Sequence, residues 1–418
     1  MMSDIGYLQL LRSNRNFRSL WLASVISMLG EWFNTIALFF IILEYTGSEF
    51  LLGFLFTVRM VSFALMQPFI GLLADRYSRK LIMVVANFVQ IFLALGFLLV
   101  DSASDIPWMF ALSGLMMLLH GTYMTAERAA IPNIVSAEDL TTANALDAAS
   151  WSTALCIGAL LGGVVVSNWG ADAAFIIDSM TFAIATLLLI PVKIQQHVEE
   201  EMKTPLFKTA FSNIKRGWLR VYTESRLLRI IFAKASWNIA GGALGGVFLV
   251  LLGSETDGFG VAMGFGIFFF ARGVGTGLGP IIARHVLKDE SKWPGLIGKL
   301  VFISGAFYVM VSLTLHFSLV LTVVLILLAH AASGANWVLS TILTQRWVED
   351  EMRGRVFSID MLFMSIPFSI STSIAGFLVQ NYNLGIQDGI LYFGSLMMLT
   401  GIMFTLWNPD NSKSVIAA

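Results

Sequence analysis

Long apolar stretches separated by short polar connections dominate the chain. Apolar runs of about 18 residues or more are long enough to cross a membrane as α-helices. The expected spanning segments are residues 19–44, 50–73, 81–101, 106–128, 142–167, 173–191, 228–253, 260–284, 295–315, 317–345, 354–380 and 387–407. The pattern therefore predicts an all-α membrane protein with twelve transmembrane helices.

A charged stretch separates the sixth segment from the seventh and divides the chain into two similar halves. The second segment carries Arg59 and then Pro68, and the eighth carries Arg272 and then Pro280. Two similar six-helix halves are a common plan of secondary transporters, with the substrate site near the membrane midplane between them. We predict an N-terminal six-helix bundle at 1–191, a cytoplasmic linker at 192–227 and a C-terminal six-helix bundle at 228–418.

Composition supports a membrane protein and argues against most other chemistry. Hydrophobic residues make up 57% of the chain and charged residues only 13%, against about 25% charged in soluble proteins. The single cysteine, Cys156, excludes a disulfide framework within the chain. The five histidines are scattered without metal-ligand spacing. We therefore expect no metal, no cofactor and no nucleic-acid partner, and an environment of lipid.

The distribution of positive charge predicts the orientation. Of the 26 Lys and Arg residues, all but Arg59, Lys234 and Arg272 fall in the ends and connections of one side. The charged residues of the opposite connections are all acidic, such as Glu49 and Asp101. Because cytoplasmic connections carry the excess of Lys and Arg, both termini are predicted to be cytoplasmic, in a cell inner (plasma) membrane.

The linker contains a candidate amphipathic helix. Its apolar residues follow at spacings of four, three and four, with basic residues off this stripe. The stripe is Phe207, Phe211, Ile214 and Trp218, and the basic residues are Lys208, Lys215 and Arg216. Such a helix is typical of a segment that lies on the inner leaflet; the alternative is a plain solvated linker.

A short charged hairpin at residues 71–81 lies between two apolar runs. It resembles the loop signature of the major facilitator superfamily, Gly-x-Leu-Ala-Asp-Arg-x-Gly-Arg-Lys. The matching residues are Gly71, Leu73, Ala74, Asp75, Arg76, Arg79 and Lys80. Ser78 stands where the family has its second glycine. The resemblance implies a transporter made of two pseudo-symmetric six-helix bundles.

Further motifs resemble the branch of multidrug, macrolide and siderophore exporters, the last of the enterobactin type. They are Asn16-Phe17-Arg18-Ser-Leu20-Trp21, Ala143-Asn144-Ala145-Leu146, Ala174-Phe175-Ile176-Ile177-Asp178 and Arg353-Gly354-Arg355-Val356-Phe357. Exporters of the superfamily often carry Gly-Pro-x-x-Gly-Gly in the fifth span. Here that segment reads Gly158-Ala159-Leu160-Leu161-Gly162-Gly163, which keeps the glycines for close helix approach but lacks the proline.

The resemblance implies a conformational latch in the hairpin. The family's matching carboxylate, here Asp75, lies at the N-terminus of the eleventh span, where a helix dipole favours an anion. The matching basic residue at the end of the fourth span, here Arg128, pairs with it. We expect Gly71, Asp75, Arg76, Arg79, Lys80 and Arg128 to form this latch. The alternative is that these charges serve only to set topology.

Ionisable groups within the bilayer are costly and are functional candidates by default. Glu31 lies about 18 Å and Arg59 about 14 Å from the outer ends of their segments, at 1.5 Å per residue, so the two could pair. Arg272 lies at a similar depth, and Asn34 shares a helix face with Glu31. We expect these four residues near the substrate cavity, with Glu31 binding the proton or a cationic substrate. The alternative is a fixed Glu–Arg pair that holds helices together.

Four other charged residues are expected to act in gating or packing. Asp178 lies near the outer side of its segment, which favours packing or an outer gate over proton binding. Asp147 and Asp360 are shallow on the cytoplasmic side, and Lys234 could pair with either. His120 and His330 are deep, where a lone histidine is more often a packing residue than a proton relay.

These features favour a secondary active transporter over an enzyme. No Walker motif occurs, so ATP drive is not expected, and no nucleophile–base pair or metal cluster stands out. We predict a monomeric, proton-coupled exporter (antiporter) of small amphipathic organic compounds, such as drugs or macrolides, that works by alternating access. Siderophore export and lysophospholipid transport are the alternatives within transport. A membrane sensor that binds without turnover is the alternative from another class.

Overall fold

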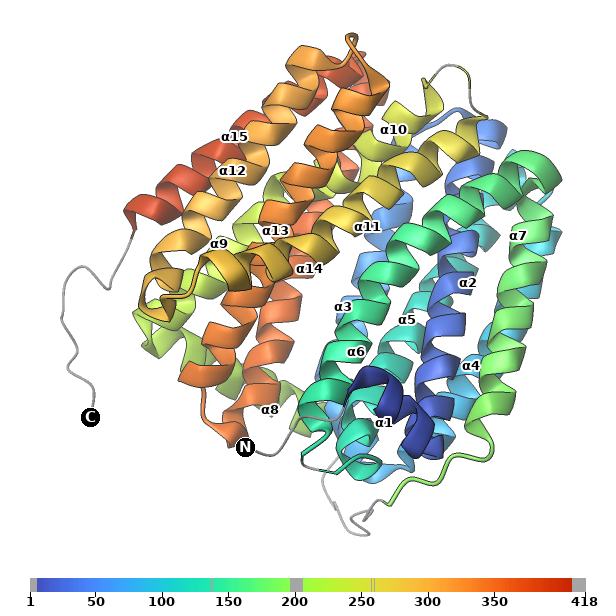
Figure 1. The fold of residues 1–418 in the computed structure, drawn as a ribbon. Coiled ribbons are helices and arrows are strands. Elements are labelled where there is room, and N and C mark those ends of the chain that lie inside the picture. Colours follow the sequence, from blue (N-terminus) through green and yellow to red (C-terminus); the bar gives the residue numbers. More distant parts are fainter. Residues whose placement is uncertain (1–5, 137, 196–205, 257, 259, 408–418) are drawn as a thin grey trace. The chain divides into compact units, whose positions relative to one another are not determined.

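The computed structural model describes residues 6–136, 138–195, 206–256, 258 and 260–407. The side chains at positions 70, 71, 74, 75, 141, 206, 207 and 350 lie outside this description. The described residues form helices and contain no strand (Figure 1). The α-helices are α1 Tyr7–Ser13, α2 Arg15–Thr46, α3 Glu49–Arg76, α4 Arg79–Gly96, α5 Ile106–Ala130, α6 Leu140–Thr153, α7 Ala159–Leu189, α8 Leu206–Thr223, α9 Ser225–Gly242, α10 Phe248–Ser254, α11 Val261–Val286, α12 Trp293–Thr314, α13 Leu319–Trp347, α14 Asp350–Tyr382 and α15 Ile386–Leu406.

Eleven helical segments in the described part of the chain are long and apolar enough to cross a membrane. The longest, Thr142–Leu189, has 48 residues. Its length is about 72 Å at 1.5 Å per residue, more than twice a hydrocarbon core of about 30 Å. Gly170, with φ 80°, interrupts the helical backbone between its two parts; a positive φ is readily available to glycine. This segment therefore supplies two crossings, and the predicted twelve-helix class is confirmed.

Two of the spanning segments contain π-helical turns, η4 at Ala154–Gly158 and η5 at Ala243–Val247. The first joins α6 to α7, and the second joins α9 to α10. Pro68, Pro280 and Pro367 lie inside α3, α11 and α14. Such interruptions are tolerated in membrane helices because neighbouring groups satisfy the freed backbone atoms.

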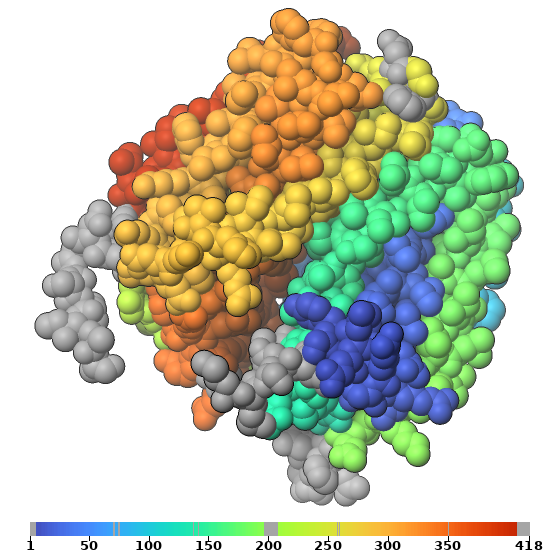
Figure 2. Space-filling model, in the orientation of Figure 1, coloured from blue at the N-terminus to red at the C-terminus, as the bar shows by residue number. Residues whose placement is uncertain are grey.

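One compact unit contains the described residues of 1–47, 65–210 and 253–270. In it, α2 packs along α7, and α4 packs against α5 and α7. Gly162 allows α7 to approach α2, because a Cβ at this position would lie 3.1 Å from the Cα of Phe33. The short helix α1 lies on the surface of this unit and contacts α2 and α6 (Figures 1 and 2).

The second compact unit contains the described residues of 48–64, 211–252 and 271–418. Here α12 packs against α13 and α15, and α9 packs against α14 and α15. Arg229 of α9 is 1% exposed and joins the ends of two other helices. It donates hydrogen bonds to the carbonyls of Pro294 at 2.6 Å, Phe404 at 2.7 Å and Trp407. A cation suits the carbonyls at the end of α15, which are the negative end of its dipole.

Glycines bring helices from different parts of the chain into backbone contact within each unit. In the second unit, a Cβ on Gly53 of α3 would lie 2.3 Å from the carbonyl oxygen of Thr372 on α14. In the first unit, a Cβ on Gly163 of α7 would lie 2.7 Å from the carbonyl oxygen of Ala262 on α11. The fifth-span glycines therefore serve close approach, as expected from small residues at membrane helix contacts.

The apolar stripe of the linker helix α8 is divided between a buried and an exposed part. Ile214 and Trp218 contact a buried cluster that includes Val221 and Val356, and the Trp218 ring stacks on Phe363 at 5.3 Å. Phe211 is exposed, and the Phe207 side chain lies outside the described residues. The linker thus contains a helix, and half of its apolar stripe packs against residues of α9 and α14. Its predicted place on the inner leaflet stays a prediction.

Candidate functional site

Glu31 and His120 are in direct contact inside the first unit. Glu31 Oε2 of α2 lies 2.8 Å from Nδ1 of His120 on α5, and the side chains are 18% and 16% exposed. His120 thus has a polar partner in the bundle, and the choice between a satisfied packing residue and a proton relay stays a prediction. The depth of each residue in its own helix can be predicted from the sequence, but only the register between α2 and α5 brings the two together.

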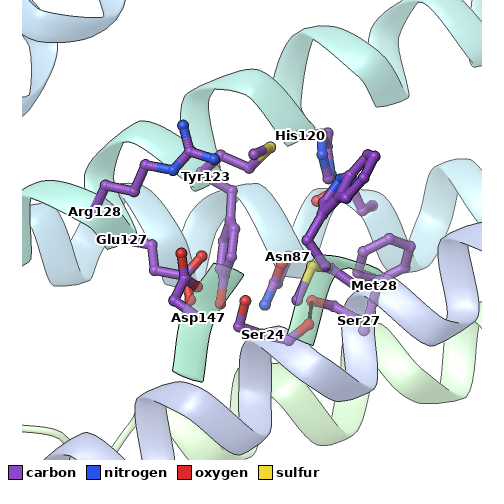
Figure 3. A pocket seen from close by; sticks show the side chains of 13 residues that line it. Ser24, Ser27, Met28, Asn87, His120, Tyr123, Glu127, Arg128 and Asp147 are labelled. Carbon is purple, nitrogen blue, oxygen red and sulfur yellow. Dashed lines mark hydrogen bonds between the residues drawn. The ribbon is translucent and has the colours of Figure 1, made fainter. Parts of the chain in front are cut away.

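A small polar pocket extends from His120 through the interior of the same unit (Figure 3). Its volume is about 20 Å³, and its lining comes from α2, α4, α5, α6 and α7. The polar and charged residues that line it are Ser24, Ser27, Asn87, Gln90, His120, Tyr123, Glu127, Arg128 and Asp147. Such a concentration of polar side chains inside an apolar bundle marks a candidate functional site.

Two carboxylates lie at one end of this pocket. Glu127 of α5 is 5% exposed, and Asp147 of α6 is half-buried. The two interact electrostatically with each other, and Arg128 interacts with both. In Figure 3 their carboxyl groups lie near the Tyr123 hydroxyl and Ser24. Asp147 thus has a place in the pocket in addition to its predicted gating role. Sequence reasoning did not single out Glu127, although it follows His120 by seven residues on one helix face.

Asn34 and Arg59 are both buried, but they belong to different units. Asn34 is 1% exposed, and its Nδ2 lies 3.8 Å from the Met116 sulfur. Arg59 is 8% exposed and lies in the second unit. A pairing of Arg59 with Glu31, which is in the first unit, therefore stays a prediction, and the described partner of Glu31 is His120.

Arg272 of α11 reaches the π-helical turn η5 in the second unit. Its Nη1 donates a hydrogen bond to the carbonyl of Gly245 at 2.5 Å. Near this turn, His330 of α13 bonds the Tyr308 hydroxyl through Nε2 at 2.7 Å, and both residues are buried. His330 is therefore a satisfied interior histidine, in agreement with the packing interpretation. The role of Arg272 in substrate binding stays a prediction.

Lys234 and Asp360 form a buried ion pair in the second unit. The Lys234 Nζ lies 2.5 Å from Asp360 Oδ2, and the side chains are 4% and 1% exposed. The same ammonium lies 4.5 Å from the centroid of the Trp337 ring. Of the two predicted partners of Lys234, the structure thus supports Asp360. The third predicted gating residue, Asp178 of α7, is fully buried and lies beside Gly30 of α2.

Two basic residues of the 71–81 hairpin bind helix ends within the first unit. Arg79 donates hydrogen bonds to the Ala129 carbonyl at 2.6 Å and to Asn133 Oδ1 at 2.5 Å. Lys80 donates to the Ile190 carbonyl at 2.5 Å. Each cation therefore lies at the negative end of a helix dipole, at the ends of α5 and α7.

The other predicted members of the latch are only partly described. Arg76 ends α3, and Arg128 is exposed at the pocket. The positions of the side chains of Gly71 and Asp75 lie outside the described residues. The start of α14, the predicted partner of Asp75, belongs to the second unit. The latch therefore stays a prediction.

Twelve apolar crossings with a polar pocket inside define a polytopic membrane protein of the secondary-transporter class. The chain belongs to the Major Facilitator Superfamily, whose family model matches residues 20–321. The two-bundle, twelve-helix layout is that of this superfamily, which consists of transporters and not enzymes. The family resemblance of the 71–81 hairpin is thereby confirmed.

Named relatives include efflux proteins. The chain is 21% identical to macrolide efflux protein A of Streptococcus pyogenes over 394 residues, 94% of this chain and 96% of the relative. It is 22% identical to the candidate bacilysin exporter BacE of Bacillus subtilis over 308 residues, 73% of this chain and 74% of the relative. An uncharacterized transporter of Mycobacterium tuberculosis is 23% identical, over 83% of this chain and 80% of the relative.

Solved transporters share the fold. A bacterial homolog of the human lysosomal transporter Spinster, in an inward-facing and unoccupied conformation, matches with a TM-score of 0.73 and 15% identity, over 94% of this chain and 98% of that chain. The nucleoside transporter NupG matches with a TM-score of 0.75 and 12% identity, over 94% and 99%. At these identities the likeness concerns the fold.

Proposed function

We propose that this protein exports amphipathic organic compounds, such as drugs or macrolides, in exchange for protons. The observation that carries the proposal is the Glu31–His120 contact, which places a carboxylate and an imidazole together in the interior of a membrane-spanning bundle. A carboxylate whose burial and charged neighbours change during a transport cycle can take up and release a proton. The named efflux relatives support export as the direction.

The proposed cycle is alternating access between an N-terminal body at 1–191 and a C-terminal body at 228–418, joined by the 192–227 linker. The substrate cavity lies near the midplane, with Asn34, Arg59 and Arg272 among its lining residues. Asp75 and Arg128 act as the latch at the cytoplasmic ends. The protein works as a monomer in the cell inner membrane, with both termini in the cytoplasm, as the positive charges of the connections favour.

A binding screen followed by transport tests this function. Purified protein is screened for compounds that raise its melting temperature, because a ligand that binds the folded state stabilises it. The hits, together with a macrolide, are then followed in proteoliposomes under an imposed pH gradient. Gradient-driven flux of a hit supports the proposal. Binding without flux under any gradient would contradict the proposal and would favour a sensor. Flux of only lysophospholipids or siderophores would show that the proposed substrate class, drugs or macrolides, is wrong.

A further inference from the structure

Helices α2 and α5 each carry two polar residues that are seven residues, or about two helical turns, apart. On α5, His120, Tyr123 and Glu127 follow at spacings of three and four, which places them on one face. On α2, the pocket-lining Ser24 precedes Glu31 by seven residues. Seven residues rise about 10.5 Å in a helix. Because Glu31 meets His120 while Ser24 and Glu127 line the same pocket, the two helices run antiparallel with their polar faces in register.

The pocket has the size and the lining that a bridging water requires. Its volume is about 20 Å³, and a site of roughly 10–15 Å³ or more with polar partners can hold one water. The Asn87 amide nitrogen is buried beside it and has no hydrogen-bond partner within the described part of the chain, and the Tyr123 hydroxyl lies in the same pocket beside Ser24. Buried polar groups normally bond to protein or to water. The pocket therefore offers polar groups that could orient a water between His120 and Glu127.

Glu127 and Asp147 lie at the end of the pocket that Arg128 also lines. Glu127 is the more buried of the two, and Arg128 interacts electrostatically with both. Figure 3 shows the two carboxyl groups together, apart from His120. Burial of a carboxylate in a membrane interior is expensive unless it has a function or a firm partner. A carboxylate pair beside a polar pocket is a suitable acceptor for a mobile proton.

We propose that Glu31, His120, one pocket water, Tyr123, Glu127 and Asp147 form a proton relay inside the N-terminal bundle. This inference rests on the proposed function. A proton taken up by Glu31 passes to Nδ1 of His120, and the imidazole gives the proton on Nε2 to the water. The water passes one of its protons to the Tyr123 hydroxyl, which lines the pocket between the two ends and gives its own proton to the Glu127 carboxylate. Glu127 shares this proton with Asp147 and releases it at that end of the pocket. One proton enters and one leaves; the imidazole is left with its proton on Nδ1, and a flip of the ring restores the starting tautomer.

Two further charged groups lie beside the relay. Arg128 lies at its end, and the pocket lining from α4 is the neutral pair Asn87 and Gln90. Asp178 of α7 lies beside Gly30, the neighbour of Glu31 on α2. Arg128 and Asp178 are therefore among the charges that surround the relay.

Two transport modes separate a relay residue from a substrate-binding residue. Wild type, Glu127→Gln and Asp147→Asn are reconstituted and tested with a compound that wild type transports. Transport driven by a pH gradient requires net proton movement, whereas counterflow exchange at equal pH requires only substrate movement. We expect both variants to lose gradient-driven flux by roughly tenfold or more, since a positioned proton carrier contributes at least this much. Glu127→Gln should keep counterflow within about twofold. Glu138→Gln removes an exposed carboxylate near the start of α6 and is the matched control; it should alter neither mode.

Each outcome decides between named possibilities. If Glu127→Gln and Asp147→Asn keep gradient-driven flux, the relay is wrong while proton-coupled export stands. If both variants lose counterflow as well, the carboxylates belong to the substrate or conformational machinery, and the relay is also wrong. If wild type shows no gradient-driven flux with any compound, the proposed function itself fails. Melting curves of the purified variants show whether a loss of both modes reflects unfolding. If it does, Glu127→Asp is tested in its place, because it keeps the carboxyl group. This variant must retain both transport modes if the relay is correct.

Discussion

The Oε2 atom of Glu31 lies 2.8 Å from Nδ1 of His120, and both side chains retain partial exposure inside the membrane-spanning unit. This geometry distinguishes the pair from Lys234 and Asp360, which are almost completely buried. A buried pair of fixed charges suits a permanent structural contact. A partly exposed carboxylate and imidazole in direct contact suit proton exchange, because solvent can reach both groups and each can carry a proton.

Glu31→Gln should abolish proton-driven export. The amide keeps the size and a hydrogen bond to His120 but cannot bind and release a proton, so gradient-driven flux is expected to fall by roughly tenfold or more. Flux in proteoliposomes under an imposed pH gradient measures this. Glu44→Gln, an exposed carboxylate on the same helix, is the matched control and should leave the flux unchanged. Normal gradient-driven flux in Glu31→Gln would exclude Glu31 as the coupling carboxylate.

Separating Lys234 from Asp360 should destabilise the protein strongly. Asp360→Ala leaves a buried ammonium without its carboxylate, and breaking such a pair typically costs about 3–5 kcal/mol. The double variant Lys234→Met with Asp360→Leu removes both charges and should lose less stability than either single variant. Thermal unfolding of the purified proteins compares them. The Arg346–Glu290 pair is about half exposed, and Arg346→Ala should cost no more than about 1 kcal/mol. Equal losses at the two pairs would contradict this assignment.

Gly376→Ala should disturb the contact between α14 and α3. A Cβ at Gly376 would lie 2.3 Å from the carbonyl oxygen of Glu49, so the helices must separate, at an expected cost of about 1–3 kcal/mol. Gly354 lies on the same helix α14, and a Cβ added there would have no atom within 4 Å. Gly354→Ala should therefore be neutral or stabilise the helix by about 0.5–1 kcal/mol. Melting temperatures of the two variants test the contrast, and an undisturbed Gly376→Ala would refute the close contact.

The link between α8 and the start of α14 should weaken in acid. Arg220 donates hydrogen bonds to both carboxylate oxygens of Glu349, at 3.0 and 3.1 Å, and these bonds lower the pKa of Glu349. A lowered folded-state pKa means that the contact stabilises the protein fully above the ordinary Glu pKa of roughly 4.3 and loses this effect as the pH falls through the folded-state value.

Arg220→Ala tests this pH dependence. The melting-temperature difference between wild type and Arg220→Ala should be largest near neutral pH and should shrink as the pH falls below roughly 4. Arg216 is an exposed basic residue on the same helix, and Arg216→Ala should show no such change with pH. A difference for Arg220→Ala that grows in acid would show that Glu349 is not the partner that matters.

The spanning helices could be predicted from the sequence because each is a long apolar run. The length of such a run is a property of one segment and does not depend on how the segment packs. The break at Gly170 follows from the same pattern, since the run of 142–191 is too long for one crossing. The 71–81 hairpin was identifiable because its spacing of charges and small residues is specific to the family.

The pairings inside the bundle could not be predicted in the same way. Periodicity places His120 on a face of α5, but it does not give the register of α5 against α2, which brings His120 to Glu31. The split of the α8 stripe has a similar cause, because Trp218 and Phe211 are equally apolar and only the neighbouring helices decide which of them is covered. Glu127 directly precedes Arg128 near the end of its segment, and its sequence position does not show that Asp147 of another helix lies beside it.

Proton movement that accompanies substrate movement tests proton-coupled export most directly. Proteoliposomes with a trapped pH-sensitive dye and no imposed pH gradient are given an outward or inward gradient of a transported compound. Exchange predicts that the substrate gradient drives protons in the opposite direction, in wild type but not in Glu31→Gln, with the signal removed by a protonophore. Substrate flux in wild type without any proton movement would contradict the account.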